Sequence, residues 1–212
     1  MIVVVGGHSR NIGKTAVMEG IARALPDLNW TAVKITQFGH GVCSSHGKNC
    51  DCSGGDDHPF ALSEERVPNL TDSGRYLAAG ASRSFWLRTK QGELAEGMPS
   101  LRRLIASAPN TLIESNSVLN FLRPDAYLFV LDHNVADIKD SARRFLERAD
   151  ALITLNASVP IPWPGVPKRW LTAKPRFAAE PPHYFPPACA RWLRARPQAG
   201  VSDGQREGPS QK

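Results

Sequence analysis

The sequence predicts an α/β protein, a three-layer sandwich in which helices cover both faces of a mainly parallel sheet of roughly seven strands. Two observations lead to this fold class. Short apolar runs alternate with stretches of helical periodicity along most of the 212 residues, as in chains built from β-α-β units. The apolar runs are also nearly continuous, which is typical of strands covered on both faces.

The amino-terminal elements follow in order. Residues 2–5 predict a first strand, and residues 14–25 predict a first helix that Pro26 ends. Residues 31–36 predict the second strand. A polar segment at about 37–70 follows and is too long for a bare connection, so we expect a loop insertion there.

The middle of the chain contains most of the remaining elements. Helical stretches are expected at 72–80, 99–107 and 137–148, and strands at 83–88, 111–114, 127–132 and 151–156.

The carboxyl-terminal part is rich in proline at 158–187, with a short strand expected at 169–173 and a final helix at 187–195. The tail at 197–212 has little to bury, and we expect it to be disordered. The predicted organisation is therefore one domain over residues 1–196.

Charge and hydropathy narrow the class of partner. The net charge of +6 comes without an unbroken basic run or an RNA-recognition pattern, so a nucleic-acid partner is not expected. A basic surface suits a protein that handles phosphorylated small molecules. No apolar stretch approaches the roughly 20 residues that span a bilayer. We expect a cytoplasmic protein without a membrane partner.

A glycine-containing loop, GHSRNIGKT at 7–15, joins the first strand to the first helix. Backbone N–H groups at a helix start bind phosphate, and a lysine and a hydroxyl there reach the β/γ-phosphates and Mg²⁺. His8 and Arg10 either touch a phosphate or face solvent. The residues assigned to nucleotide binding are Gly7, Asn11, Ile12, Gly13, Lys14 and Thr15.

The spacing of the loop is unusual. The common motif would place glycine at position 8, but five residues separate Gly7 from Gly13 here. The loop resembles those of dethiobiotin synthetase and the cobyrinic acid synthase-type amidotransferases, which are P-loop NTPases of the SIMIBI class. This resemblance implies binding of ATP or GTP with Mg²⁺, and NTP hydrolysis or phosphoryl transfer.

A second resemblance involves much of residues 2–81. Lys34 in VKIT ends the second strand, and DSGR at 72–75 leads into AGA at 79–81. These segments are similar to those of the molybdopterin-guanine dinucleotide biosynthesis adaptor (MobB) family. The resemblance implies a GTP-binding adaptor that delivers nucleotide or a pterin cofactor to a partner enzyme of cofactor biosynthesis.

Two further strand ends carry candidate site residues. Glu114 ends the strand 111–114, where a carboxylate can hold Mg²⁺ directly or through water together with Thr15. Lys14, Lys34 and Glu114 are the candidate catalytic residues. Asn156 resembles the base-reading asparagine of the class, but no guanine-reading aspartate follows it, so ATP and GTP both stay open.

The segment 40–58 holds three of the four cysteines and three of the six histidines. Thiolate and imidazole are suited to Zn²⁺. The candidate zinc ligands are Cys43, His46, Cys50 and Cys52. An Fe–S cluster, a transferable Ni²⁺ and a loop of free thiols are the alternatives.

Two rival functions stay open beside the adaptor. One is a ligase or kinase similar to dethiobiotin synthetase, with fast turnover on a specific small molecule. The other is a metallochaperone GTPase that serves a metalloenzyme partner and carries its cargo in the 40–58 loop. The adaptor and chaperone predict slow NTP hydrolysis in the isolated protein, and a homodimer is also left open.

Overall fold

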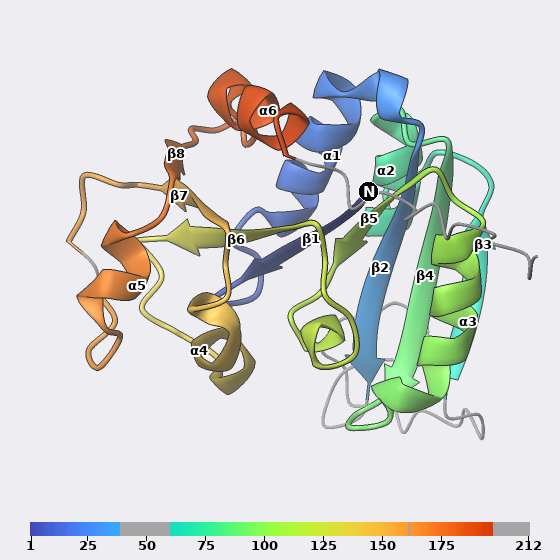
Figure 1. Cartoon of the computed structure of the whole chain (residues 1–212), viewed down its shortest axis with the longest axis horizontal. Coiled ribbons are helices and arrows are strands. Elements are labelled where there is room, and N and C mark those ends of the chain that lie inside the picture. Colours follow the sequence, from blue (N-terminus) through green and yellow to red (C-terminus); the bar gives the residue numbers. More distant parts are fainter. Residues whose placement is uncertain (39–59, 161, 197–212) are drawn as a thin grey trace, which may run out of the picture.

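The computed structural model describes residues 1–38, 60–160 and 162–196, which build one eight-stranded sheet in the order β3-β4-β2-β5-β1-β6-β7-β8 (Figure 1). Every neighbouring pair is parallel except β3 and β4. The strands are β1 (Ile2–Gly7), β2 (Trp30–Phe38), β3 (Phe60–Glu65), β4 (Arg83–Lys90), β5 (Asn110–Glu114), β6 (Ala126–Asp132), β7 (Ala151–Leu155) and β8 (Arg176–Ala178).

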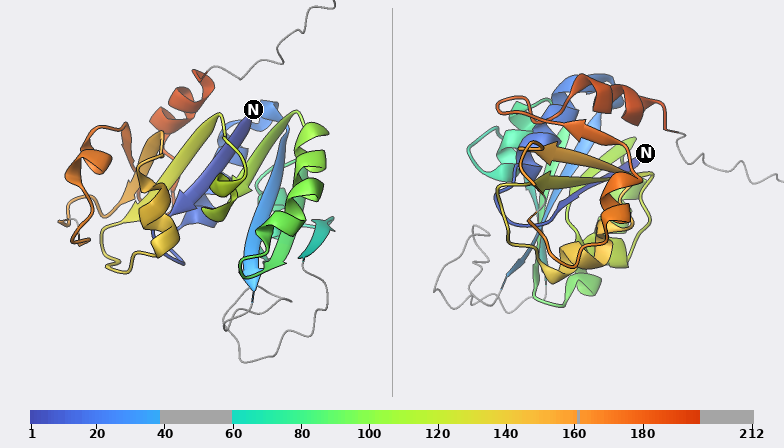
Figure 2. Two further views of the ribbon diagram at one scale, coloured as in Figure 1. Left: turned by 60° about the horizontal axis from the view of Figure 1, so that its bottom comes forward. Right: turned by 90° about the vertical axis from the view of Figure 1, so that its left-hand side faces the viewer.

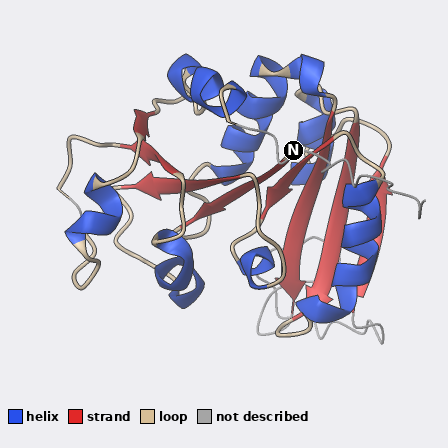
Figure 3. Cartoon of the chain, in the orientation of Figure 1, coloured by secondary structure: helices blue, strands red, loops and turns tan. Residues whose placement is uncertain are grey.

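Helices lie on both sides of this sheet (Figure 3 and the right-hand view of Figure 2). Residues of α1, α2 and α6 belong to one core cluster, and residues of α3, α4 and α5 belong to the other. The helices are α1 (Lys14–Ala24), α2 (Asp72–Ala78), α3 (Leu94–Ala106), α4 (Asp140–Leu146), α5 (Lys168–Thr172) and α6 (Pro187–Arg194), with 3-10 turns η1 (Pro26–Leu28) and η2 (Ser117–Asn120). The three-layer α/β prediction is confirmed.

The central strands bury both of their faces. In β1, Val3 and Val5 face the α1 side, whereas Val4 faces the α3 side, and all three are fully buried. In β6, Leu128 and Phe129 divide between the two cores in the same way. This double burial explains why the strands have continuous apolar sequences.

Three sequence-based expectations were wrong. The sheet has eight strands because Phe60–Glu65, expected inside the 37–70 loop, forms the antiparallel edge strand β3. Its second half is polar, as an edge strand with partial burial allows. The strand expected at 169–173 is helix α5, which follows Pro167, and the last strand, β8, lies a few residues later. Helix α3 begins at Leu94 and runs through Pro99, because Leu94, Met98 and Leu101 are buried on one face.

Two expectations fall outside the described residues, namely most of the 37–70 insertion and the tail at 197–212. Among the residues that the structure does describe, no helix is long and apolar enough to cross a membrane.

Candidate functional site

The loop between β1 and α1 has the conformation that a phosphate-binding turn requires. Asn11 has φ 55 and Gly13 has φ 88, so the chain turns through the left-handed region twice before α1 begins. Gly13 is the N-cap of α1, and no side chain caps the first turn. A Cβ on Gly13 would lie 2.8 Å from the Tyr184 ring. The N–H groups at the start of α1 therefore meet the requirement for anion binding.

Lys14 crosses the inside of this loop. Its Nζ donates to the carbonyl of Ser9 at 2.7 Å. Burial lowers the pKa of Lys14, while the nearby Glu114 carboxylate opposes that change. The ammonium group is thus held at the loop by a neutral backbone acceptor, which a phosphate oxygen can replace.

Glu114 is the centre of a buried polar cluster. It is 3% exposed, and Thr15 Oγ1 (2.9 Å) and Tyr76 OH (2.5 Å) both donate to its Oε2. Lys34, its register partner on β2, donates to Oε1 at 2.5 Å. Burial alone would raise the pKa of Glu114, but the charges of Lys34 and Lys14 outweigh it and lower the pKa to about 2. Glu114 is therefore ionised and already accepts three hydrogen bonds.

Lys34 is shared by two carboxylates. Besides Glu114, its ammonium contacts Asp72 Oδ2 at 2.9 Å. Burial opposes its charge, but Glu114 and Asp72 overcome that effect and raise the pKa of Lys34, which keeps it protonated. Asp72 begins α2 and keeps 40% of its side chain exposed. The sequence segment 72–75 indicated a resemblance only, and the structure brings its carboxylate into the site.

Asn116 fixes the end of β1. Its Oδ1 accepts from the Gly7 N–H at 3.0 Å, and its Nδ2 donates to the Gly7 carbonyl at 2.9 Å. A Cβ on Gly6 would lie 2.2 Å from Asn116 Oδ1 and 2.6 Å from Tyr127 OH. Glycine at position 6 thus lets the asparagine reach the loop, a requirement that could not be read from sequence.

His8 occupies the position where the common motif has glycine. It is fully buried, its ring centroid lies 4.6 Å from that of Trp163, and its Nε2 accepts from the Asp132 N–H at 3.1 Å. Its Nδ1 lies 2.8 Å from the Asp137 carbonyl, so Nδ1 carries the proton. Burial lowers the pKa of His8 and favours the neutral ring. His8 therefore anchors the loop in the core, and neither alternative considered from sequence holds for it.

The remaining loop residues differ in exposure. Ile12 is buried, and a Cβ on Gly7 would lie 2.7 Å from its Cδ1. Arg10 and Asn11 are exposed.

Asn156 lies at the carboxyl end of β7, apart from the Glu114 cluster. It has φ 54, is exposed, and donates from Nδ2 to Asp132 Oδ1 at 2.7 Å. Its place at the same sheet edge as the loop is compatible with a base-reading role, which stays a prediction.

The candidate zinc ligands Cys43, His46, Cys50 and Cys52 lie outside the described residues. Within the described part of the chain, no group of three or more His, Cys, Asp or Glu side chains is placed to hold a metal ion. Cys189 is buried in α6, and burial raises the pKa of its thiol to about 12, so it belongs to the core.

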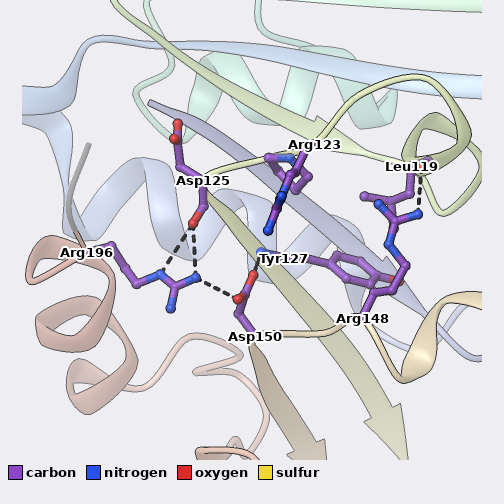
Figure 4. Close-up of a pocket in the computed structure, with 8 residues that line it drawn as sticks. Leu119, Arg123, Asp125, Tyr127, Arg148, Asp150 and Arg196 are labelled. Carbon is purple, nitrogen blue, oxygen red and sulfur yellow. Dashed lines mark hydrogen bonds and ion pairs between the residues drawn. The ribbon is translucent and has the colours of Figure 1, made fainter. Parts of the chain in front are cut away.

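A pocket of about 550 Å³ lies at the amino ends of β6 and β7, at the opposite edge of the sheet from the loop (Figure 4). Its charged groups are largely paired internally. Arg196 contacts Asp150 Oδ1 at 2.7 Å and donates to the Asp125 carbonyl, and Arg148 donates to the Leu119 carbonyl at 2.8 Å. These contacts connect the end of α6 to β6 and β7, so we regard the pocket as structural.

Comparison with known proteins identifies no family. No family model matches the sequence, and no curated protein matches it. Among solved structures, LpxK from Aquifex aeolicus in complex with ATP is 20% identical with a TM-score of 0.46, over 84% of this chain and 53% of that one. HypB from Helicobacter pylori in complex with nickel is 13% identical with a TM-score of 0.47, over 91% of this chain and 83% of that one. The chain thus spans about half the length of the LpxK chain, and both likenesses concern the fold alone.

Proposed function

We propose that the protein binds a nucleoside triphosphate with Mg²⁺ at the 7–15 loop and hydrolyses it or transfers its γ-phosphate. The observation that carries this proposal is the convergence of Lys14, Thr15, Lys34 and Glu114 beside the uncapped start of α1. Catalysis of phosphoryl transfer depends mainly on positioning and on stabilising negative charge, and this cluster offers groups for both.

Each side chain has a definite task in this proposal. The N–H groups at the start of α1 bind phosphate oxygens, and Lys14 exchanges the Ser9 carbonyl for a phosphate. Lys34, kept protonated by two carboxylates, offers positive charge to the transferred group. Glu114 orients Thr15 and Lys34 through the hydrogen bonds that it accepts.

The oxygen ligands available here suit Mg²⁺, a hard cation that prefers hydroxyl, carboxylate and water oxygens. Thr15 and Asp72 would hold the ion, and Glu114 would do so through water because protein donors already occupy its oxygens. Bound Mg²⁺ would neutralise charge on the phosphates.

The test is Mg²⁺-dependent turnover of ATP and GTP by the parent, by Glu114→Gln and by a matched control, Glu147→Gln, at an exposed position. Glu114→Gln should retain most nucleotide binding and lower turnover roughly 10²-fold, since it removes a buried charge but keeps the shape. The control should behave as the parent. Unchanged turnover and Mg²⁺ dependence in Glu114→Gln would contradict the role given to Glu114.

For the finer function, we propose a GTP-binding adaptor in molybdenum cofactor biosynthesis. The segment that suggested the adaptor family begins with Asp72, and Asp72 contacts Lys34, the other residue of that resemblance. Slow hydrolysis by the isolated protein would agree with the adaptor and with a metallochaperone. Fast turnover that needs a specific small molecule would instead favour a ligase or kinase similar to dethiobiotin synthetase. Metal released from the 40–58 loop on nucleotide binding would favour a metallochaperone.

A further inference from the structure

A second lysine, Lys139, lies beside the phosphate loop although it is far from it in sequence. It is the N-cap residue of α4, and its backbone N–H donates to the His8 carbonyl at 2.9 Å. The segment 133–139 therefore runs along the loop before α4 begins.

Several hydrogen bonds hold this segment and the loop together. Ser9 Oγ donates to Asp137 Oδ2 at 2.5 Å, and His8 Nδ1 donates to the Asp137 carbonyl. At the other end of the segment, the Asp132 N–H donates to His8 Nε2. Because these bonds involve buried loop residues, the position of Lys139 relative to the loop is set before any ligand arrives.

The Lys139 ammonium is half-buried among like charges. Burial, and then the charges of Lys14 and Arg10, lower the pKa of Lys139 to about 8, while the Asp137 carboxylate opposes this change and Lys34 adds to it. Within the described part of the chain, no acceptor lies within hydrogen-bonding distance of this ammonium, whereas Lys14 and Lys34 both have partners. A half-buried cation beside other cations is stabilised when an anion binds between them.

We propose that Lys139 binds the outer phosphates of the nucleotide and increases the preference of the site for a triphosphate over a diphosphate. This inference rests on the proposed nucleotide binding. We assign Lys139 to the outer phosphates because its charge interacts with those of Lys14 and Lys34, the two lysines proposed to contact the phosphates and the transferred group. The triphosphate carries more negative charge than the diphosphate and gains more from a further cation.

Calorimetric titration with ATP, ADP, GTP and GDP in Mg²⁺ tests this inference on the parent, Lys139→Met and Lys139→Arg. Lys168→Met, at an exposed position of α5, is the matched control. We expect Lys139→Met to weaken triphosphate binding roughly tenfold and diphosphate binding less than about twofold. Lys139→Arg should recover most of the loss because it restores the charge.

The outcomes separate this inference from the function on which it rests. If the parent binds and Lys139→Met binds the triphosphate with the same affinity, the role of Lys139 is overturned while nucleotide binding itself stands. Equal losses for triphosphate and diphosphate that arginine does not rescue would also overturn it, because they indicate a structural effect. A parent that binds none of the four nucleotides overturns the proposed function itself.

Discussion

The buried pair of Glu114 and Lys34 should contribute measurably to stability. Lowering the pKa of Glu114 from 4.5 to about 2 corresponds to about 3 kcal/mol, at about 1.4 kcal/mol for each unit. Glu114 is 3% exposed, so solvent screens this interaction little. Removing either partner leaves the other charge buried with weaker compensation, since Lys34 keeps Asp72 and Glu114 keeps the charge of Lys14. We therefore expect Glu114→Gln and Lys34→Met each to lower the free energy of unfolding by up to about 3 kcal/mol.

A double-mutant cycle isolates the interaction of this pair. Urea denaturation of the parent, both single variants and the double variant gives four free energies of unfolding. The double variant should lose at least about 1 kcal/mol less than the sum of the single losses, because it leaves neither charge alone. The exposed pair Arg83–Glu64 is the control and should couple by less than about 1 kcal/mol. Losses for Glu114 and Lys34 that add within about 0.5 kcal/mol would show that the two side chains are not coupled.

Gly6→Ala should lower the free energy of unfolding by about 1–3 kcal/mol and weaken nucleotide binding, because the added Cβ would displace Asn116 from Gly7. A free energy of unfolding and a nucleotide affinity close to those of the parent would contradict this prediction. The contribution of ionised Glu114 to the free energy of unfolding should be complete above about pH 4.5 and disappear as pH falls toward 2, because folding lowers the pKa of Glu114. The difference in stability between the parent and Glu114→Gln should therefore shrink over this pH range, and a constant difference would argue against this prediction. Protein purified without a tag should contain about one Zn²⁺ per chain by elemental analysis, and the variant with the three cysteines of the 40–58 loop changed to serine should lose it. Sub-stoichiometric metal in both samples would indicate a loop of free thiols.

The parts of the site that follow a simple rule could be predicted from sequence. The carboxyl ends of parallel strands meet at one edge, and Glu114 ends β5 as expected. Lys34 was expected to end its strand, but β2 runs on to Phe38, and Lys34 reaches the site from mid-strand as the register partner of Glu114. The start of α1 was also correct, since the loop glycine and Lys14 mark it.

Residues whose role depends on distant contacts were missed. Asn116 meets Gly7 across 109 positions, and Asp137 meets Ser9 across 128, so only the fold brings these pairs together. The role of His8 could not be predicted either, because it too depends on contacts that only the fold creates. A histidine at the glycine position of the common phosphate-loop motif gives no indication in the sequence that its side chain is buried in the core.

Strand β3 was missed for a different reason. Its sequence, FALSEE, is polar in its second half, and an edge strand needs only one neighbour and partial burial. The pattern that identifies central strands is therefore absent from it.

If the 7–15 loop binds the phosphates of a nucleotide, Lys14 is the residue on which that binding depends most. Calorimetric titration of ATP and GTP in Mg²⁺ into the parent, Lys14→Ala and the exposed control Lys168→Ala measures this dependence, with circular dichroism to show that all three are folded. We expect binding by the parent and the control and no detectable binding by Lys14→Ala, because the main charge at the β/γ-phosphates is lost. Equal affinity in Lys14→Ala and the parent would contradict it.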